Sequence, residues 1–258
     1  MSFIPKILII AGSDSGGGAG IQADIKTITY FKAYAMTAVT AITAQNTIGV
    51  QSIFPLPKEI VINQIQSVLS DLSPDVIKIG MLADIEIINY ISKNMRDFKI
   101  VLDPVMVATS GDVLVDENII DSIKNSLVEK SFLITPNIHE AEILTDIKIK
   151  NLDDQIDAAK KLLNLGCANV LIKGGHGNSD EINDVLISSN GDQHIFESKK
   201  IKSTNTHGTG CSLASAIASN IGLGNDIKQS IKNSIEYVQN GIENAPDFGS
   251  GNGPIRHF

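Results

Sequence analysis

The residues best suited to chemistry lie in the run Asn-Thr-His-Gly-Thr-Gly-Cys at positions 205–211, which leads directly into the stretch 212–218. Gly208 and Gly210, with β-branched threonines beside them, disfavour a helix interior, whereas the residues that follow favour a helix. We therefore expect a turn into a helix N-terminus, where backbone N–H groups are unpaired and the helix dipole is positive. Because glycine lets a bulky anion approach the backbone, the pattern predicts a phosphate-binding turn. The alternative is a structural glycine turn with a capping threonine.

Cys211 ends this turn, where a helix N-terminus is expected to lower the pKa of a thiol. A thiolate at this place can accept a proton from a bound hydroxyl group, so Cys211 is a candidate general base. The alternative is an inert, buried cysteine. Cys167 is the second of two cysteines, and the absence of CxxC or Cys/His spacing argues against a disulfide framework or a structural zinc site.

Acidic and amide residues follow two further apolar runs. Asp103 comes directly after the run 99–102, and Glu140 stands three residues after Asn137 at an expected helix start. The carboxyl ends of strands in open α/β sheets face the ligand, so Asp103 is a candidate for binding Mg²⁺ or its waters. Asn137 and Glu140 can face the same side and hold a metal ion and a phosphate. The alternatives are an Asp-Pro turn and a helix capping box.

A glycine-rich loop at 12–20 separates an apolar run from a helical pattern, which is the layout of a ligand-binding turn or of a purely structural one. It lacks the Gly-Lys-Ser/Thr of a Walker A loop. Asp24, one turn into the helix, and Gln45, after an apolar segment, can together hydrogen-bond a small polar substrate; Asp24 can instead be a helix-dipole partner. Lys173, beside two glycines at a strand end, suits a phosphate or nucleotide contact, or is simply solvated.

These residues need a scaffold that gathers strand ends at one edge. Short apolar runs alternate along the chain with segments whose apolar residues recur every three or four positions, which indicates strands followed by helices. Asn190-Gly191 between two apolar runs predicts a hairpin near the end. We expect one α/β domain over residues 1–258, with a mainly parallel central sheet and helices on both faces.

Bulk composition narrows the class of partner. The chain has 258 residues, 43% of them hydrophobic, which is enough for one large core. Its formal net charge of -8, with scattered basic residues, argues against a nucleic-acid partner. Neither a signal peptide nor a membrane-spanning segment is evident, so we expect a cytoplasmic protein without a membrane partner.

Short motifs along the chain match one family, in that family's order. The matching segments are residues 11–24, 44–47, 78–82, 102–111, 135–137, 173–176, 205–211 and 253–254. Together they resemble the hydroxymethylpyrimidine/phosphomethylpyrimidine kinases, the thiamine-pathway members of the ribokinase-like superfamily. Two positions depart from the family pattern: His139, which stands where proline is usual and which we expect to face solvent, and Arg256 near the end.

The resemblance implies a ribokinase-like fold, a homodimer, and a kinase that uses ATP and Mg²⁺. It implies phosphorylation of the hydroxymethyl group of 4-amino-5-hydroxymethyl-2-methylpyrimidine and then of the monophosphate to the diphosphate, for thiamine diphosphate biosynthesis. By similarity the pyrimidine pocket is lined by Gly12, Asp24, Gln45, Met81 and Val107. The nucleotide and metal positions are Lys173, Asn137, Thr206 and Gly208, with Asp103 and Glu140 for Mg²⁺, and the anion hole is formed by Gly208, Gly210 and Cys211.

Three other functions are weighed against this one. A pyridoxal or pyridoxine kinase of the same superfamily would act on a similar ring alcohol, and Cys211 also matches some of these enzymes; elsewhere in the superfamily an aspartate usually stands at this place as the base. A cysteine hydrolase would use Cys211 with a histidine such as His207. A non-catalytic module would bind ATP and pyrimidine without turnover.

Overall fold

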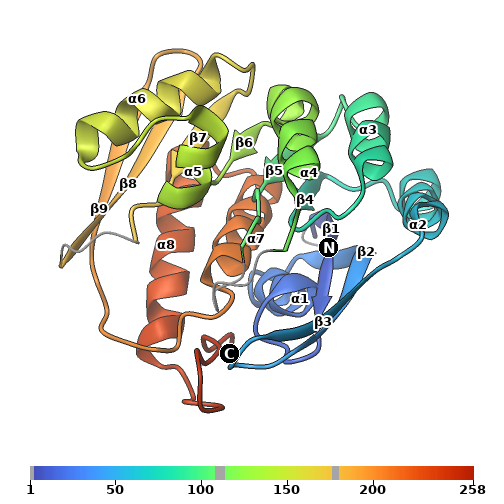
Figure 1. Ribbon diagram of the computed structural model, residues 1–258, viewed down its shortest axis with the longest axis horizontal. Helices are drawn as coiled ribbons and strands as arrows, with labels where there is room; N and C mark the ends of the chain where they lie inside the picture. The colour runs from blue at the N-terminus through green and yellow to red at the C-terminus, as the bar shows by residue number, and fades with distance from the viewer. Residues whose placement is uncertain (1–2, 108–113, 176–179) are drawn as a thin grey trace.

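The computed structural model describes residues 3–107, 114–175 and 180–258, and these contain a nine-stranded sheet in the order β3-β2-β1-β4-β5-β6-β7-β8-β9 (Figure 1). The strands are β1 Lys6–Asp14, β2 Tyr34–Gln45, β3 Val50–Pro55, β4 Val76–Ile79, β5 Lys99–Leu102, β6 Leu133–Ile134, β7 Asn169–Ile172, β8 Glu181–Ser188 and β9 Gln193–Lys199. The six strands from β2 to β7 in this order are parallel. The expected mainly parallel sheet is therefore confirmed.

Strand β1 is the second strand of the parallel part, between β2 and β4. Its residues Ile7 to Ile10 are fully buried, as the unbroken apolar run predicted for a strand covered on both faces. Parallel strands end at the same edge of a sheet, so the loops after β1, β2, β4, β5, β6 and β7 meet at that edge. This arrangement places the predicted site residues within reach of one another.

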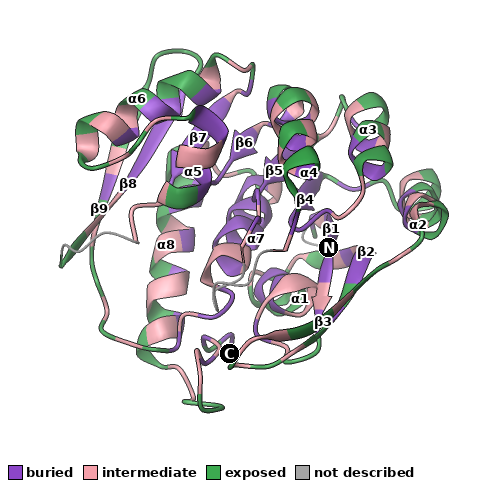
Figure 2. Cartoon of the chain, viewed as in Figure 1, coloured by how far each residue is buried: buried purple, intermediate pink, exposed green. Residues whose placement is uncertain are grey.

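Helices cover both faces of the sheet, as expected. They are α1 Gly20–Tyr30, α2 Lys58–Asp71, α3 Ile85–Asn94, α4 Glu117–Ser122, α5 Ile138–Thr145, α6 Leu152–Leu163, α7 Thr209–Gly222 and α8 Ile227–Glu243, with a π-helix at Ile123–Leu127 and a 3-10 turn at Val128–Lys130. Buried residues of α2 to α6 form one apolar cluster with the sheet, and those of α1, α7 and α8 form the other. Helix α7 is the most enclosed, with every residue from Ser212 to Ile221 buried (Figure 2).

Antiparallel pairs close the sheet at both sides. The β8–β9 hairpin turns at Gly191, which has φ +91°, and confirms the Asn-Gly signal. At the other side β3 pairs antiparallel with β2, and the sequence analysis did not predict this strand. Parts of two family motifs, at 108–111 and at His176, lie outside the described residues. Within the described part of the chain, no helix is long and apolar enough to cross a membrane.

Candidate active site

A cavity of about 730 Å³ opens at the edge where the parallel strands end. Its lining includes all but one of the predicted site residues: Gly12, Gln45, Met81, Asp103, Val107, Asn137, Glu140, Lys173, Thr206, Gly208, Gly210 and Cys211. The exception is Asp24. The structure therefore brings together residues that are as far apart in the sequence as Gly12 and Cys211.

The start of α7 forms one corner of this cavity. Gly208 is the N-cap in a left-handed conformation with φ +79°, and no side chain among the described residues caps the helix. A Cβ on Gly208 would lie 1.8 Å from the carbonyl oxygen of Gly18, so only glycine fits here. The first N–H groups of a helix lack intrahelical acceptors and carry its positive dipole end. The turn that was predicted to bind phosphate therefore lies at the cavity wall, and its N-cap is a glycine rather than a threonine.

Charged side chains face this helix start. A Cβ on Gly210 would lie 3.3 Å from Lys173 Nζ and 3.6 Å from Asp103 Oδ2. Lys173 Nζ donates to Asp103 Oδ1 at 2.9 Å, and the Thr135 hydroxyl lies 3.2 Å from the same oxygen. Burial acts to lower the pKa of Lys173, but the charges of Asp103 and Glu140 outweigh it and raise the pKa, so the ammonium stays charged. A positive group thus stands beside the amides of α7.

Glu140 and Asn137 form a capping box at the start of α5, which was the structural alternative for this pair. The Asn137 side chain accepts from the Glu140 N–H at 2.8 Å, and Glu140 Oε2 accepts from the Asn137 N–H at 2.8 Å. Both residues nevertheless line the cavity. Burial raises the pKa of Glu140 to about 7; the charge of Lys173 opposes this rise and that of Asp103 adds to it.

Two buried carboxylates in the lining of one cavity, those of Asp103 and Glu140, fit the chemistry of Mg²⁺. This ion prefers oxygen ligands and is usually bound through one or two carboxylates, substrate phosphates and several waters. Asp103 and Glu140 supply that number, while no cluster of three or more His, Cys, Asp or Glu suited to a metal is found among the described residues. A cation would also relieve the unfavourable burial that raises the pKa of Glu140.

Cys211 lies at the cavity wall as predicted, but its ionisation differs from the prediction. Burial raises the pKa of the thiol to about 11, although the charge of Lys78 acts to lower it. The expectation that the helix N-terminus lowers this pKa below the usual range is therefore wrong, because burial outweighs the favourable charges. Without bound substrate, Cys211 is a thiol at neutral pH.

Asp24 requires a second correction. Its carboxylate is fully buried, where both oxygens accept from Lys78 Nζ at 2.9 Å and one accepts from the Ser215 hydroxyl at 2.7 Å. Asp24 faces α7 and is absent from the cavity lining, so the predicted pairing with Gln45 on a substrate is wrong. Lys78 lines the cavity instead. Asp24 raises the pKa of Lys78 against the effect of burial, so this ammonium remains charged.

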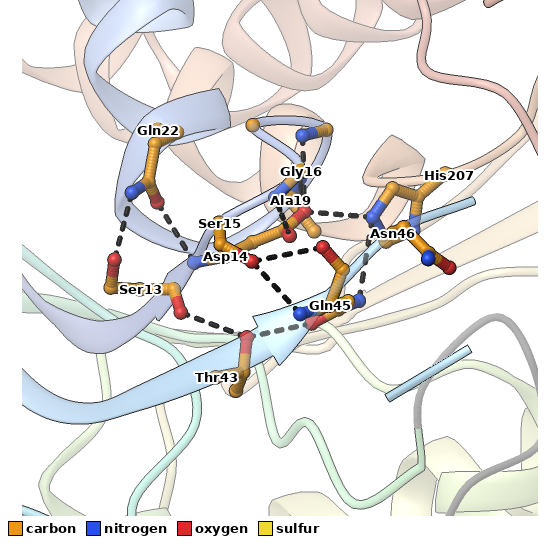
Figure 3. A network of polar contacts seen from close by, with 12 residues as sticks. Ser13, Asp14, Ser15, Gly16, Ala19, Gln22, Thr43, Gln45, Asn46 and His207 are labelled. Atoms are coloured by element: carbon orange, nitrogen blue, oxygen red, sulfur yellow. Dashed lines mark hydrogen bonds and ion pairs between the residues drawn. The ribbon is translucent and has the colours of Figure 1, made fainter. Parts of the chain in front are cut away.

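The glycine loop after β1 is organised by its own aspartate (Figure 3). Asp14 accepts from the N–H groups of Gly16 at 2.7 Å, Gly18 at 3.0 Å and Ala19 at 2.8 Å. His207 Nε2 lies 2.8 Å from the same carboxylate and 3.4 Å from the Gln45 amide nitrogen. The polar contacts of the His207 ring are therefore with Asp14 and Gln45, which does not support the hydrolase alternative that pairs His207 with Cys211.

The contacts of Lys78, Asp14 and His207 were not predicted from the sequence. One signal was present for Lys78, because a lysine in the otherwise apolar run 76–79 must find a partner when the strand is buried. No spacing rule indicated that Asp14 fills its own loop. His139 is exposed, as expected, although it stands at the rim of the cavity.

The side of the cavity that was predicted to bind the pyrimidine, around Gly12, Gln45, Met81 and Val107, is mostly neutral. Gly12 packs against Met81, whose sulfur would lie 3.3 Å from a Cβ at Gly12. Gln45, half-buried at the end of β2, presents its amide beside Thr43 and His207. Val107 is half-buried in the lining. An amide above apolar side chains is suited to a flat ring that carries both a hydrogen-bond donor and an acceptor.

The chain is similar in sequence to a known family of kinases. The family described as "Phosphomethylpyrimidine kinase" matches residues 14–256. The chain is 41% identical to the hydroxymethylpyrimidine/phosphomethylpyrimidine kinase of Bacillus subtilis, over 99% of this chain and 95% of that protein. It is 42% identical to the thiamine biosynthesis bifunctional protein ThiED of Geobacter sulfurreducens, over 98% of this chain, and spans about half (52%) of that longer protein.

Solved structures agree in fold. An ADP complex of Bacillus subtilis pyridoxal kinase has a TM-score of 0.90 at 32% identity, over 99% of this chain and 98% of that one. Staphylococcus aureus pyridoxal kinase with AMP-PCP has a TM-score of 0.91 at 30% identity, over 99% and 94%. The phosphomethylpyrimidine kinase of Clostridium difficile has a TM-score of 0.81 at 39% identity, over 92% and 98%.

Proposed function

The chain belongs to the phosphomethylpyrimidine kinase family and is a phosphotransferase, and from this premise we propose the reaction that its site performs. ATP phosphorylates the hydroxymethyl group of 4-amino-5-hydroxymethyl-2-methylpyrimidine, and the monophosphate is then phosphorylated to the diphosphate. Both steps serve thiamine diphosphate biosynthesis, in agreement with the names of the relatives.

One observation supports this function above all others. The open amides at the start of α7 and the amide of Gln45 belong to the same cavity. The first group suits a phosphoryl group and the second suits a polar ring. A kinase needs both within one enclosed space, because phosphoryl transfer depends on in-line positioning and charge stabilisation more than on covalent chemistry.

Each part of the charged corner has a task in this reaction. The amides of Gly208, Gly210 and Cys211, at the positive end of α7, stabilise the transferring phosphoryl group. Lys173, kept charged by its carboxylate neighbours, adds a second positive group. Asp103 and Glu140 would hold Mg²⁺, which supplies neutralisation of the phosphate charge when bound.

We propose Cys211 as the residue that accepts the proton of the substrate hydroxyl. Burial disfavours the thiolate, whereas the charge of Lys78 and a hydrogen bond from the Gly20 N–H favour it, and the thiolate is the form that accepts the proton. Cys211→Ala should lower kcat by about a hundredfold with KM little changed, as expected on loss of a general base. Cys167→Ala is the matched control, since Cys167 is buried away from the cavity lining. A loss below about tenfold contradicts the base assignment.

A coupled assay of ATP consumption tests the whole function. The purified protein is offered the pyrimidine alcohol, its monophosphate and pyridoxal, each with ATP and Mg²⁺. We expect turnover of the first two compounds. Absence of ATP consumption with every pyrimidine alcohol overturns the proposal and leaves the non-catalytic alternative.

Pyridoxal kinase activity is the second candidate, because the structural neighbours with TM-scores of 0.90 and 0.91 are pyridoxal kinases. Their identities of 32% and 30% lie below the 41% and 42% shared with the thiamine-pathway proteins, and the family match also favours the pyrimidine. If kcat/KM in the same assay is higher for pyridoxal than for the pyrimidine alcohol, pyridoxal kinase becomes the preferred assignment.

The β2–β3 edge supports a homodimer. Ile42 and Phe54 are paired across these strands and are 50% and 62% exposed, and Ile48 in the connecting loop is 66% exposed. Apolar side chains gathered along an edge strand commonly mark an interface. Sedimentation velocity should show a dimer of the wild type and a monomer of Phe54→Glu; a monomeric wild type contradicts the proposal.

We also propose that residues 1–258 form one kinase domain and that the protein works in the cytoplasm, where its nucleotide substrate is present. The family match over 14–256 and the single sheet support the first statement. Limited proteolysis should release no stable half of the chain, and cell fractionation should find the protein in the cytosolic fraction.

A further inference from the structure

His207 links two parts of the cavity: its side chain lies beside Gln45, and its backbone leads into the N-cap of α7. Its ring is buried between the glycine loop and the end of β2, with Nε2 close to Asp14 and to Gln45 (Figure 3). It also directly precedes Gly208, the N-cap of α7, and its backbone N–H donates to the Gly253 carbonyl at 3.0 Å. The His207 side chain, which lies beside the Gln45 amide, therefore belongs to the residue that precedes the proposed phosphate-binding turn.

The partners of Asp14 decide where the hydrogen of His207 lies. Burial acts to raise the pKa of Asp14, but the hydrogen bond from His207 and those from the amides of Ala19 and Gly16 outweigh it, and the pKa is lowered. Asp14 is thus an ionised carboxylate that can only accept. With Nε2 2.8 Å from this oxygen, Nε2 must carry a hydrogen and donate it.

A protonated Nε2 has a consequence for the neighbouring amide. The Gln45 nitrogen lies 3.4 Å from Nε2, and two N–H groups that face each other repel. Thr43 imposes no preference, because its one hydroxyl hydrogen can go to Gln45 Oε1 or to the Ser13 carbonyl, each at 3.0 Å. In the second case the Thr43 oxygen can accept from the Gln45 amide. The donor on His207 therefore favours the amide turned with its oxygen toward the ring.

We propose that His207 is a positioning residue that fixes the orientation of the Gln45 amide and thereby determines which order of donor and acceptor the ring of the substrate must present. A 4-aminopyrimidine carries a ring-nitrogen acceptor beside an amino donor, whereas a 4-oxopyrimidine carries a ring N–H donor beside a carbonyl acceptor. A fixed amide accepts one order and rejects the other, since a mismatch leaves buried polar groups unpaired. The inference rests on the proposed function.

The experiment compares the kcat/KM of the 4-amino alcohol with that of its 4-oxo analogue. His207→Leu removes the donor, so both amide orientations become accessible, and the amino/oxo ratio should fall about thirtyfold, mainly through KM. His207→Gln retains an N–H donor and should keep the ratio within about threefold of the wild type. His194→Leu is the control, because His194 is exposed on β9 outside the cavity lining and should leave the ratio unchanged.

A folded His207→Leu that loses activity on both compounds by the same factor overturns the inference, because a purely structural role predicts an unchanged ratio. If that variant does not fold, long-range ¹⁵N–¹H NMR of the wild-type imidazole decides: a hydrogen on Nε2 supports the inference, and a hydrogen on Nδ1 alone overturns it. A wild type that phosphorylates neither compound contradicts the proposed function instead, so the two failures are distinguishable.

Discussion

Two glycine-rich turns lie at the same edge of the sheet, and they differ in whether a side chain accepts hydrogen bonds from their backbone amides. In the turn after β1, the N–H groups of Gly16, Gly18 and Ala19 converge on the Asp14 carboxylate. In the turn before α7, no side chain from the described part of the protein caps the helix start, and Gly208 and Gly210 line the cavity. The first turn already contains its anion, supplied by the chain; the second is open to an anion from solution.

The difference shows what makes an amide-rich turn a ligand site. Glycines and a following helix produce convergent N–H groups in both places, so the backbone geometry alone does not separate a binding turn from a structural one. What differs is whether a carboxylate accepts hydrogen bonds from the amides of the turn, as Asp14 does. The two turns also touch, since Gly208 packs on the Gly18 carbonyl, so the turn after β1 supports the turn before α7.

The largest effect is expected when the Asp14 carboxylate is removed from the turn after β1, which is called the filled turn below. Asp14→Ala leaves three amides, of which that of Gly18 is buried, and the buried His207 without their acceptor, and should lower the free energy of unfolding by about 4 kcal/mol in urea titrations. Asp84→Ala is the matched control, because Asp84 accepts two amides at the exposed start of α3 and should cost only about 1 kcal/mol. Equal losses would mean that the internal anion has no special importance.

The same residue gives a pH dependence with a defined sign. The folded state lowers the pKa of Asp14 below 3.8, so its stabilisation is fully present above that value and is lost as pH falls through the folded-state pKa. Unfolding of the wild type should become easier with acid in this range. The Asp14→Ala protein should show a smaller decline over the same pH interval.

The second largest effect is expected from Gly208→Ala, which tests the contact between the two turns. Its positive φ and a Cβ 1.8 Å from the Gly18 oxygen require the backbone to move, so we expect a stability loss of about 3 kcal/mol and at least a hundredfold loss of kcat. Gly224→Ala has a similar φ of +90° with nothing within 4 Å, and should cost only the strain, about 1 kcal/mol. If the two variants behave alike, the clash between the turns is unimportant.

Gly210→Ala should separate activity from stability. Its Cβ would project toward Lys173 and Asp103, into the space assigned to the phosphoryl group, without contacting backbone. Thermal unfolding should change little, because alanine is at least as favourable as glycine in a helix. We expect kcat/KM for ATP to fall about tenfold or more through lost transition-state contacts. Unchanged kinetics would place the phosphate elsewhere in the cavity.

The sequence predicted the fold and the gathering of the site more reliably than the protonation states. Alternating apolar runs indicated the parallel sheet, and the strand-end rule correctly placed Gln45, Asp103 and Lys173 at one cavity. Burial was not foreseeable in the same way. Asp24 lies behind Lys78, and Cys211 has a raised thiol pKa, because neighbouring elements exclude water from both.

The hydrogen bonds between Asp14 and the amides of its own loop were likewise not predictable from the sequence. Asp14 follows an apolar run and precedes glycines, which is also what a ligand-binding loop requires. Only the three-dimensional path of the loop shows that its amides point back to this carboxylate. Strand β3 was missed because the run 50–55 mixes polar and apolar residues and is largely exposed at the sheet edge.

The smallest effect is expected from Gly12→Ala, at the pyrimidine side next to the filled turn. The added methyl group would meet the Met81 sulfur at 3.3 Å and the Ala41 carbonyl at 3.7 Å, and the end of a methionine side chain can move aside. KM for the pyrimidine alcohol should rise about threefold while KM for ATP stays constant. Gly210→Ala should instead lower kcat and leave KM for the pyrimidine alcohol unchanged, so the two variants test the two regions separately. If Gly12→Ala instead impaired ATP and pyrimidine equally, the neutral and charged ends of the cavity would not act separately, and the difference between the two turns would matter for folding alone.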